Sequence, residues 1–325
     1  MKMTIRQLAQ YCNVSIGTID RVLNNRPGVS PKTKEKVERS VRELGYSPNY
    51  LAQSLSTGRS MSIGVILFNL RNMFFAQLSD AIVDASDKRG LFPYLMLSER
   101  SKDQELSCVE NLISRQVDGI ILFSTNNDPA FIHRLQVCSL PIVTVMTKLP
   151  NLPNVGIDDY AAMNNAAKYI MSKKYERIIY ISPPLSYTAM NIEVSKLRYA
   201  GFLNAIEGTG VEHMLIKDYD YLNAIDSLNM KTGKKTAFIC TSDIYALNIL
   251  QHLKLRGLNP PYDYGVLGFD NIETLQYVDP CISTVAVPIE LIGRTAVDIL
   301  ADGIAGSPLE SKCFPHTIVA GQTIV

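Results

Sequence analysis

A concentration of positive charge in the first 60 residues is the feature of this sequence best suited to binding a polyanion. These residues include ten Lys and Arg against four Asp and Glu, a local balance of +6 in a chain whose net charge is +1. The other 265 residues carry 22 basic and 27 acidic side chains, a balance of −5. A basic segment joined to a mildly acidic body is typical of a nucleic-acid-binding module. A solvated helical face is the alternative that charge alone leaves open.

Residue types that support catalysis or metal binding are scattered along the chain. The histidines are His133, His213, His252 and His316, and the cysteines are Cys12, Cys108, Cys138, Cys240, Cys281 and Cys313. Their spacing fits neither a zinc site nor a disulfide framework, and the chain contains no nucleophile elbow or phosphate-binding loop motif. We therefore expect no catalytic residues, no metal and no cofactor.

Length and hydropathy bound the class of protein. A chain of 325 residues predicts roughly two domains. Its 46% hydrophobic and 19% charged residues exclude a disordered or low-complexity protein. The chain has no apolar run of about 18 residues and no apolar signal segment at its start, so we expect no membrane association. Scattered cysteines without a secretory signal fit a cytoplasmic location.

Three short helices must position the basic side chains. Apolar residues recur at helical spacing after Thr4 and again after Ser15, and both residues are good N-caps. Asn13 tolerates the left-handed conformation that a tight turn between these helices requires. Ser30 opens a third helix with Pro in its first position, and Gly45 ends it. Two short helices joined by a tight turn and braced by a third form a helix-turn-helix module, whose second helix would lie in the major groove.

The segment TIRQLAQYCNVSIGTIDRVLNNRPGVSPKTKEKVERSVRELGYSPN, residues 4–49, resembles the N-terminal domain of the lactose-repressor (LacI/GalR) family of bacterial transcription regulators. The shared features are VS before the second helix, RVLN within it, VS-x-x-T opening the third helix and LGY-x-PN after it. The resemblance implies that the base-reading residues are Ile16, Gly17, Asp20 and Arg21. It also implies that the phosphate-contacting residues are Thr4, Ser15, Thr18, Asn24, Ser30, Thr33, Tyr46 and Asn49. Hydroxyl, amide and phenol groups suit phosphate oxygens, and an Arg can donate two hydrogen bonds to guanine.

The base-reading positions depart from the family pattern. Asp20 stands where the family usually has Ser, and its carboxylate could accept a hydrogen bond from cytosine or could orient Arg21 through an ion pair. Ile16 and Gly17 allow only methyl contact or close approach of the backbone. We therefore expect an operator that differs from those of better-known members.

Residues 49–60 form a linker that is too short to be a stable helix alone in water. In the family this stretch is a hinge helix that orders when two copies pair over DNA, and its Leu enters the minor groove. Ala52 and Leu55 match the groove-facing positions. The alternative is an ordinary amphipathic linker helix, with Leu55 packed on the body.

The remainder of the chain alternates β-branched runs with helical stretches. The predicted strands span residues 62–68, 92–97, 119–123, 142–146, 177–182, 236–241, 265–269 and 283–287. This pattern predicts an α/β body of two lobes with parallel, doubly wound sheets, and a ligand site at the carboxyl ends of the strands. The expected domains are an all-α helix-turn-helix head at 1–48, the hinge at 49–60 and the body at 61–325. The first lobe would comprise about 61–158 and 289–314, and the second about 159–287 and 316–325.

The body also resembles the LacI/GalR family and the related periplasmic sugar-binding proteins. The landmarks are NMFF at 72–75, VDGII at 117–121, R-x-x-GF at 198–202, TSDIYAL at 241–247 and GFDN at 268–271. In relatives, aromatic rings sandwich a sugar while Arg and Asp bind its hydroxyls, which is chemistry suited to stacking and charge-assisted hydrogen bonds. The effector-binding residues that the resemblance implies are Asn72, Phe74, Phe75, Thr147, Arg198, Tyr219, Ser242 and Asp270.

Several of these positions differ from relatives that bind plain sugars. Met146 and Thr147 stand where those relatives often have Asp and Arg, Ser242 where they have Asn, and Val287 where they have Gln. We therefore expect a sugar or sugar derivative that is smaller, less hydroxylated or otherwise modified. A core role is the alternative for each aromatic residue, and a helix cap is the alternative for Asp270.

Together these features predict a cytoplasmic, ligand-responsive transcription regulator, in particular a repressor of a carbohydrate-related operon. It would bind a near-palindromic operator in double-stranded DNA as a homodimer. The effector would change the closure of the lobes and so bias whether two hinge segments pair over DNA. The alternatives are a solute-binding protein without a regulatory role, which the body alone would support, and an α/β enzyme.

Overall fold

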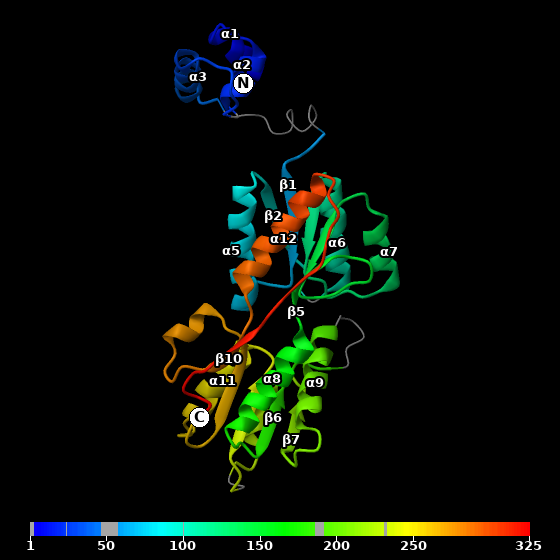
Figure 1. The fold of residues 1–325 in the computed structure, drawn as a ribbon, viewed down its shortest axis with the longest axis vertical. Coiled ribbons are helices and arrows are strands. Elements are labelled where there is room, and N and C mark those ends of the chain that lie inside the picture. Colours follow the sequence, from blue (N-terminus) through cyan, green and yellow to red (C-terminus); the bar gives the residue numbers. More distant parts are fainter. Residues whose placement is uncertain (1–2, 24, 47–57, 100, 186–191, 231–232) are drawn as a thin grey trace. The chain divides into compact units, whose positions relative to one another are not determined.

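The computed structural model describes residues 3–23, 25–46, 58–99, 101–185, 192–230 and 233–325. The chain divides into two compact units, Met1–Met61 and Ser62–Val325, which we call the head and the body (Figure 1). Asn24 lies outside the described residues. So does most of the predicted hinge, including Asn49, Ala52 and Leu55.

The head contains the three predicted helices. They are α1 (Ile5–Tyr11), α2 (Ile16–Leu23) and α3 (Pro31–Glu43). Asn13, with φ of 48°, makes the turn between α1 and α2, and Gly45, with φ of 58°, follows the end of α3. Leu8, Ile19 and Val37 are fully buried, one from each helix, and form the centre of the head's core. The helix-turn-helix prediction is confirmed.

Six parallel strands form the first sheet of the body, in the order β11-β5-β4-β3-β1-β2. They are β1 (Ser62–Leu67), β2 (Phe92–Leu97), β3 (Gly119–Leu122), β4 (Ile142–Val145), β5 (Asn154–Ile157) and β11 (Lys312–Phe314). Helices cover both faces of this sheet, as parallel strands require. Ile63 and Val65 pack on one face with α5 (Met73–Lys88) and α12 (Ile289–Ile304), which lie side by side in Figure 1. Ile66 packs on the other face with α6 (Lys102–Ser114) and α7 (Pro129–Val137).

The second sheet repeats this arrangement in the order β12-β10-β9-β8-β6-β7. Its strands are β6 (Arg177–Ile181), β7 (Glu212–Ile216), β8 (Thr236–Cys240), β9 (Gly265–Asp270), β10 (Ser283–Ala286) and β12 (Thr317–Val319). Its helices are α8 (Asp159–Ser172), α9 (Glu193–Ile206), α10 (Tyr221–Asp226), α11 (Asp243–Lys254) and the 3-10 helix η1 (Glu273–Tyr277). The predicted two-sheet α/β architecture is confirmed. One correction concerns β12, which runs antiparallel to β10.

Three connections join the two sheets. The chain passes from β5 to α8, returns from β10 to α12, and passes again from β11 to β12. Each sheet is therefore assembled from segments that are far apart in the sequence. The carboxyl ends of β5 and β10, where two of these connections leave, lie beside the predicted ligand-binding segments.

Candidate functional site

The N-terminal turn of α2 presents its side chains to solvent. Ile16, Gly17 and Arg21 are exposed, whereas Ile19 on the inner face is fully buried. A Cβ atom added at Gly17 would lie 3.7 Å from the Ser15 hydroxyl oxygen, an ordinary contact. Packing within the head therefore does not require glycine here, and its missing side chain leaves this surface open to close approach by a partner.

Hydroxyl groups predicted to contact phosphates occur at the start of all three helices of the head. The capping hydrogen bonds run from Gln7 N to Thr4 Oγ1 (3.3 Å), from Thr18 N to Ser15 Oγ (3.1 Å) and from Thr33 N to Ser30 Oγ (3.2 Å). The hydroxyl oxygens of Ser15 and Thr18 lie 2.9 Å apart, and those of Ser30 and Thr33 lie 2.8 Å apart. These caps fix the hydroxyl groups where the helix dipoles favour negative charge.

The carboxylate of Asp20 pairs with Arg26. Arg26 Nη1 lies 3.1 Å from Asp20 Oδ2, and both side chains are exposed. Adjacent residues on a helix do not face each other. Accordingly, no ion pair between Asp20 and Arg21 occurs within the described part of the head. Base reading by Asp20 and by Arg21 remains a prediction.

Tyr46 lies in the core of the head rather than on its surface. Its side chain is only 9% exposed and belongs to the same cluster as Leu8 and Val37. Burial also raises the pKa of its phenol. Tyr46 therefore stabilises the head, and its contact with a phosphate remains a prediction.

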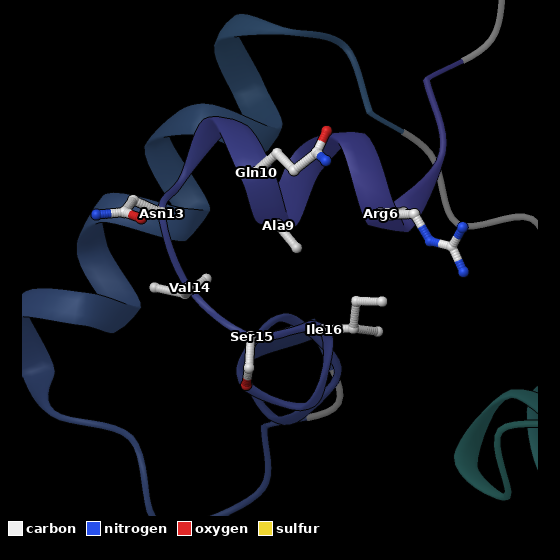
Figure 2. Close-up of a pocket in the computed structure, with 7 residues that line it drawn as sticks. All are labelled: Arg6, Ala9, Gln10, Asn13, Val14, Ser15 and Ile16. Carbon is white, nitrogen blue, oxygen red and sulfur yellow. The ribbon is translucent and has the colours of Figure 1, made fainter.

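A groove of about 540 Å³ runs between α1 and the start of α2 (Figure 2). It is lined by Arg6, Ala9, Gln10, Asn13, Val14, Ser15 and Ile16. Only the last two of these residues were predicted to contact DNA. Helical spacing is the feature of the sequence that could have identified Arg6, Gln10 and Asn13, because they follow one another at intervals of four and three residues.

In the body, Arg198 is buried on α9 and held by three interactions. Its Nε atom lies 2.8 Å from Asp159 Oδ1, and its Nη1 atom donates to the carbonyl oxygen of Thr241 at 2.6 Å. Its guanidinium carbon lies 3.6 Å from the centre of the Phe269 ring. These contacts connect α9 with the start of α8 and with the carboxyl ends of β8 and β9.

Asp270 ends β9 beside Arg198 and is buried. The Ser242 side chain lies beside its carboxyl group, and Ser242 also caps α11 by accepting from Ile244 N at 3.3 Å. Burial raises the pKa of Asp270 well above its usual range, and the positive charge of Arg198 opposes that rise. The N-cap of η1 is Ile272, so the helix-cap alternative for Asp270 is wrong. The structure thus brings together Arg198, Ser242 and Asp270 from the predicted set.

Asp243 is a second buried carboxyl group next to Asp270. Its Oδ1 atom accepts from the Thr284 hydroxyl at 2.6 Å, and its Oδ2 atom accepts from Ile272 N at 2.9 Å. Burial nevertheless raises its pKa to about 7. A Cβ atom at Gly268 would overlap the Asp243 carboxylate, so this strand position can hold only glycine.

The predicted residues at the start of α5 have structural roles. Asn72 caps the helix, because its Oδ1 atom accepts from Phe74 N at 3.1 Å. Phe74 and Phe75 are buried in the core of the first sheet, and the Phe75 ring centre lies 4.7 Å from that of Phe123. The core role left open for these aromatic residues is therefore present. Effector binding by them stays a prediction.

Thr147 belongs to a polar network that fixes the segments after β3 and β4. Its Oγ1 atom accepts from Ser124 N at 2.9 Å. Glu105, fully buried on α6, accepts from the Ser124 hydroxyl at 2.5 Å and from both the N–H and the hydroxyl of Thr125 at 2.8 Å. Burial raises the pKa of Glu105, and these hydrogen bonds oppose the rise.

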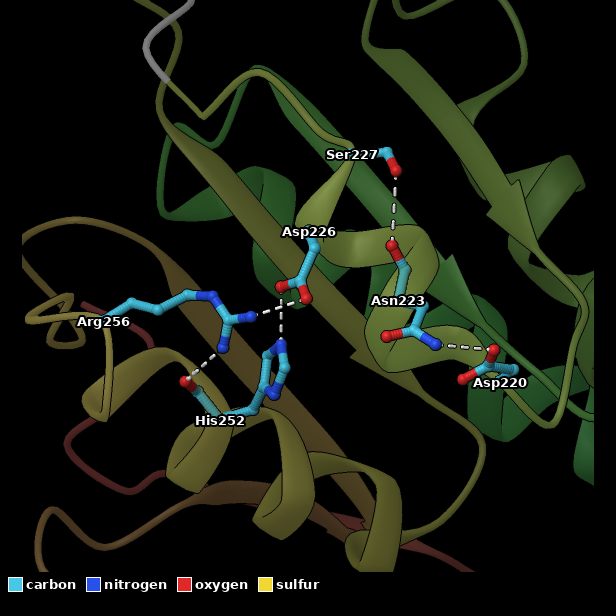
Figure 3. Close-up of polar contacts among 6 residues, drawn as sticks. All are labelled: Asp220, Asn223, Asp226, Ser227, His252 and Arg256. Carbon is cyan, nitrogen blue, oxygen red and sulfur yellow. Dashed lines mark hydrogen bonds and ion pairs between the residues drawn. The ribbon is translucent and has the colours of Figure 1, made fainter.

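Tyr219 is 43% exposed, unlike the buried Arg198 and Asp270. It precedes α10, which a surface cluster ties to the end of α11 (Figure 3). Asp226 Oδ1 lies 2.7 Å from His252 Nε2, and Asp226 Oδ2 accepts from Arg256 Nη2 at 2.5 Å.

Sequence reasoning missed Asp159, Asp243 and Glu105. Asp159 and Asp243 each open a helix that follows a strand, β5 and β8 respectively, and this position was the available signal. Glu105 has no such signal, because it is one of two acidic residues in the first turn of an ordinary amphipathic helix. Among the residues that the structure describes, no cluster of three or more His, Cys, Asp or Glu could hold a metal ion. No helix in those residues is long and apolar enough to cross a membrane.

Comparison with known proteins matches both units. The family model of bacterial regulatory proteins of the lacI family matches residues 4–49, and that of the periplasmic binding protein-like domain matches residues 167–324. Catabolite control protein A of Priestia megaterium is 29% identical over 334 residues, which cover 99% of each chain. The HTH-type transcriptional repressor CytR of Escherichia coli (strain K12) is 27% identical over 317 residues, covering 95% of this chain and 92% of CytR.

A solved structure shares the fold over its whole length. The lac repressor dimer bound to operator and the anti-inducer ONPF matches with a TM-score of 0.83, at 24% identity and 100% coverage of both chains. Both the head and the two-sheet body therefore have counterparts in the same known proteins. The chain thus joins a head that matches the lacI family of bacterial regulatory proteins to a body that matches periplasmic binding protein-like domains.

Proposed function

We propose that this protein is a ligand-responsive repressor of transcription that binds operator DNA through its head and a small effector through its body. The observation that carries the proposal is the combination of two sites in one chain. The head exposes Arg21 and Gly17 on α2, and the body brings Arg198 and Asp270 together at the carboxyl ends of its strands. Neither site resembles an arrangement for catalysis.

In the head, α2 would enter the major groove with Arg21, Asp20, Ile16 and Gly17 toward the bases. An exposed Arg without a partner among the described residues can donate two hydrogen bonds to guanine. The capped hydroxyl groups at the helix starts would contact phosphates and fix the register of the head on DNA. Ala52 and Leu55 would contact the minor groove between two half-sites.

Operator binding would require two copies of the chain. The related lac repressor is a dimer on its operator. A two-fold symmetric pair of heads reads a near-palindromic site, so we propose a homodimer. Because its DNA partner is chromosomal, the protein would act in the cytoplasm.

In the body, Arg198, Ser242 and Asp270 would bind hydroxyl groups of a sugar or sugar derivative. Charged groups in a buried site form strong hydrogen bonds with such hydroxyls. Binding would compete with the contacts that Arg198 makes to Asp159 and Thr241. An effector would thereby favour one arrangement of the two sheets, to the extent that its affinity for the two arrangements differs.

The test of DNA binding is selection of duplexes from a random pool by the full chain, followed by affinity measurements at several salt concentrations. We expect a near-palindromic motif and an affinity that falls steeply as salt rises. The control is the chain without residues 1–58, which should retain its folded body and select nothing. A motif selected by the truncated chain would contradict the proposal.

A thermal-shift screen of the full chain against sugars, sugar acids and nucleosides tests the body. A ligand at 100 times its dissociation constant should stabilise the body by about 2.7 kcal/mol. The same ligand should change the affinity for the selected duplex. A ligand that stabilises the body without changing DNA affinity would favour a solute-binding protein, and turnover of the ligand would favour an enzyme.

A further inference from the structure

The first two residues of α2 lack polar side chains where a recognition helix normally meets the bases. Ile16, which is 43% exposed, offers only methyl and methylene groups, and Gly17 offers none. The next residue, Thr18, is committed to Ser15 through its backbone N–H and its hydroxyl. Hydrogen-bond reading of bases at this end of the helix must therefore come from a side chain outside α2.

Arg6 is a cation without a partner in the part of the head that the structure describes. It is exposed in the first turn of α1 and forms no ion pair or hydrogen bond with any described residue. Several other basic residues of the head are already paired, among them Arg26 with Asp20 and Arg39 with Glu35. The Arg6 guanidinium is thus free to bind a ligand outside the head.

Arg6 and Ile16 line the same groove. The groove lies between α1 and the start of α2, and Figure 2 shows Arg6 and Ile16 at one end of it while Asn13 lies at the other. An arginine side chain is long enough to pass the branched side chain of Ile16 and reach what lies in front of it. Since the start of a recognition helix faces base edges, the Arg6 guanidinium would arrive at the same edges.

We propose that Arg6 is a base-reading residue that supplies from α1 the hydrogen bonds that Ile16 and Gly17 cannot make. It binds guanine O6 and N7 at the base pair flanking the one that contacts Ile16, once in each half-site. This proposal rests on the proposed function, because it requires α2 to lie in the major groove. A phosphate contact is the competing role, since many Arg contacts to DNA are to phosphates.

The experiment repeats the duplex selection with the full chain and with two variants that each remove one positive charge, Arg6→Gln and Arg39→Gln. Arg39 is exposed on α3 and pairs with Glu35 at 2.9 Å, so its variant controls for the loss of charge. We expect the unaltered chain and Arg39→Gln to select guanine at one symmetric pair of positions. Arg6→Gln should lose that preference or exchange it for adenine, while the rest of the motif is unchanged.

Affinity for the selected duplex should fall about tenfold to a hundredfold with Arg6→Gln, and far less with Arg39→Gln. A uniform loss of affinity with an unchanged motif and a salt slope shallower by about one would identify a phosphate contact and overturn base reading. Equal affinities for Arg6→Gln and Arg39→Gln would overturn any specific contact. If the unaltered chain selects no motif, the proposed function itself fails, which is a distinct result.

Discussion

The functional arginines of the head and of the body lie in opposite environments, one exposed and the other buried. Arg21 in the head is exposed and has no partner among the described residues, so its side chain contributes little to folding. Arg198 in the body is buried and holds Asp159, Thr241 and Phe269. A surface site can be altered without loss of the fold, whereas a site built from buried charges is also part of the structure. Binding and stability should therefore separate cleanly in the head and remain coupled in the body.

The largest effect is expected for Arg198→Ala. Removing one partner of a buried ion pair leaves the Asp159 charge uncompensated and should lower the free energy of unfolding by about 3–5 kcal/mol. The control is Arg134→Ala, which removes an equally direct contact with Glu110 (2.7 Å) in a much more exposed pair and should lower stability far less. Urea unfolding of both variants provides the measurement. Equal losses would mean that burial does not distinguish the two arginines.

The free energy of unfolding should also depend on pH, through a buried carboxyl group of the body. The pKa of Asp243 is about 7 in the folded protein, and the unfolded value is close to the ordinary 3.8, so the folded state binds the proton more tightly. Its contribution to stability is therefore complete below pH 4 and is lost as pH rises toward and through 7. Between pH 5 and pH 8, the loss of stability measured by urea unfolding should be smaller in Asp243→Asn than in the unaltered chain by an amount on the order of 2 kcal/mol. A variant with the same pH dependence as the unaltered chain would contradict this assignment.

Arg21→Ala is the counterpart of Arg198→Ala in the head. Loss of a bidentate contact with guanine should weaken binding to the selected duplex by about 1–3 kcal/mol. Because the side chain is exposed, the free energy of unfolding should change by no more than about 0.5 kcal/mol. Fluorescence anisotropy with labelled duplex and urea unfolding measure the two quantities, with Arg39→Ala as the charge-matched control. A large loss of stability would remove the distinction between head and body.

The smallest effect is expected for Gly17→Ala, which should raise the stability of the head and lower its affinity for DNA. Alanine fits this helical position without a clash and should stabilise the head by about 0.5–1 kcal/mol. The added methyl group would obstruct the surface that meets DNA, so affinity for the selected duplex should fall. Thermal unfolding and fluorescence anisotropy on the same samples test this. Gly28 is unsuitable for a matched substitution, because its φ of 97° would make alanine strained. Unchanged DNA affinity would place Gly17 outside the interface.

The local signals in the sequence were sufficient for the head and for most of the body. Caps such as Thr4 and Ser30 and the turn residue Asn13 act within a few residues of themselves, and the structure has the helices that they predict. In the body, β5, β7 and β11 were not predicted. β7 exposes three of its five residues and β11 has only three residues, so neither has a recognisable apolar pattern. β11 depends on its pairing with β5, which is far away in the sequence.

The candidate site in the body was only partly predictable for the same reason. Arg198 and Asp270 were found through motifs, but their burial and the partnership of Arg198 with Asp159 follow from helix packing across 39 residues of sequence. Glu105 was missed because a charged residue in an amphipathic helix is expected to face solvent. Phe74 and Phe75 were placed at a site, which stays a prediction, and the structure shows that both are buried in a core. Composition cannot separate these two roles for an aromatic residue.

The three connections between the sheets have a consequence for how the protein is made. The first sheet is incomplete without α12 and β11, and the second without β12, so neither can finish folding until the ribosome has synthesised residues near 319. The head needs only the first 46 residues, whose core is formed by neighbouring helices. At about 5–20 residues per second, the head would emerge and fold tens of seconds before the body. During synthesis the chain would therefore carry a finished DNA-reading unit while its effector-sensing unit was still being made.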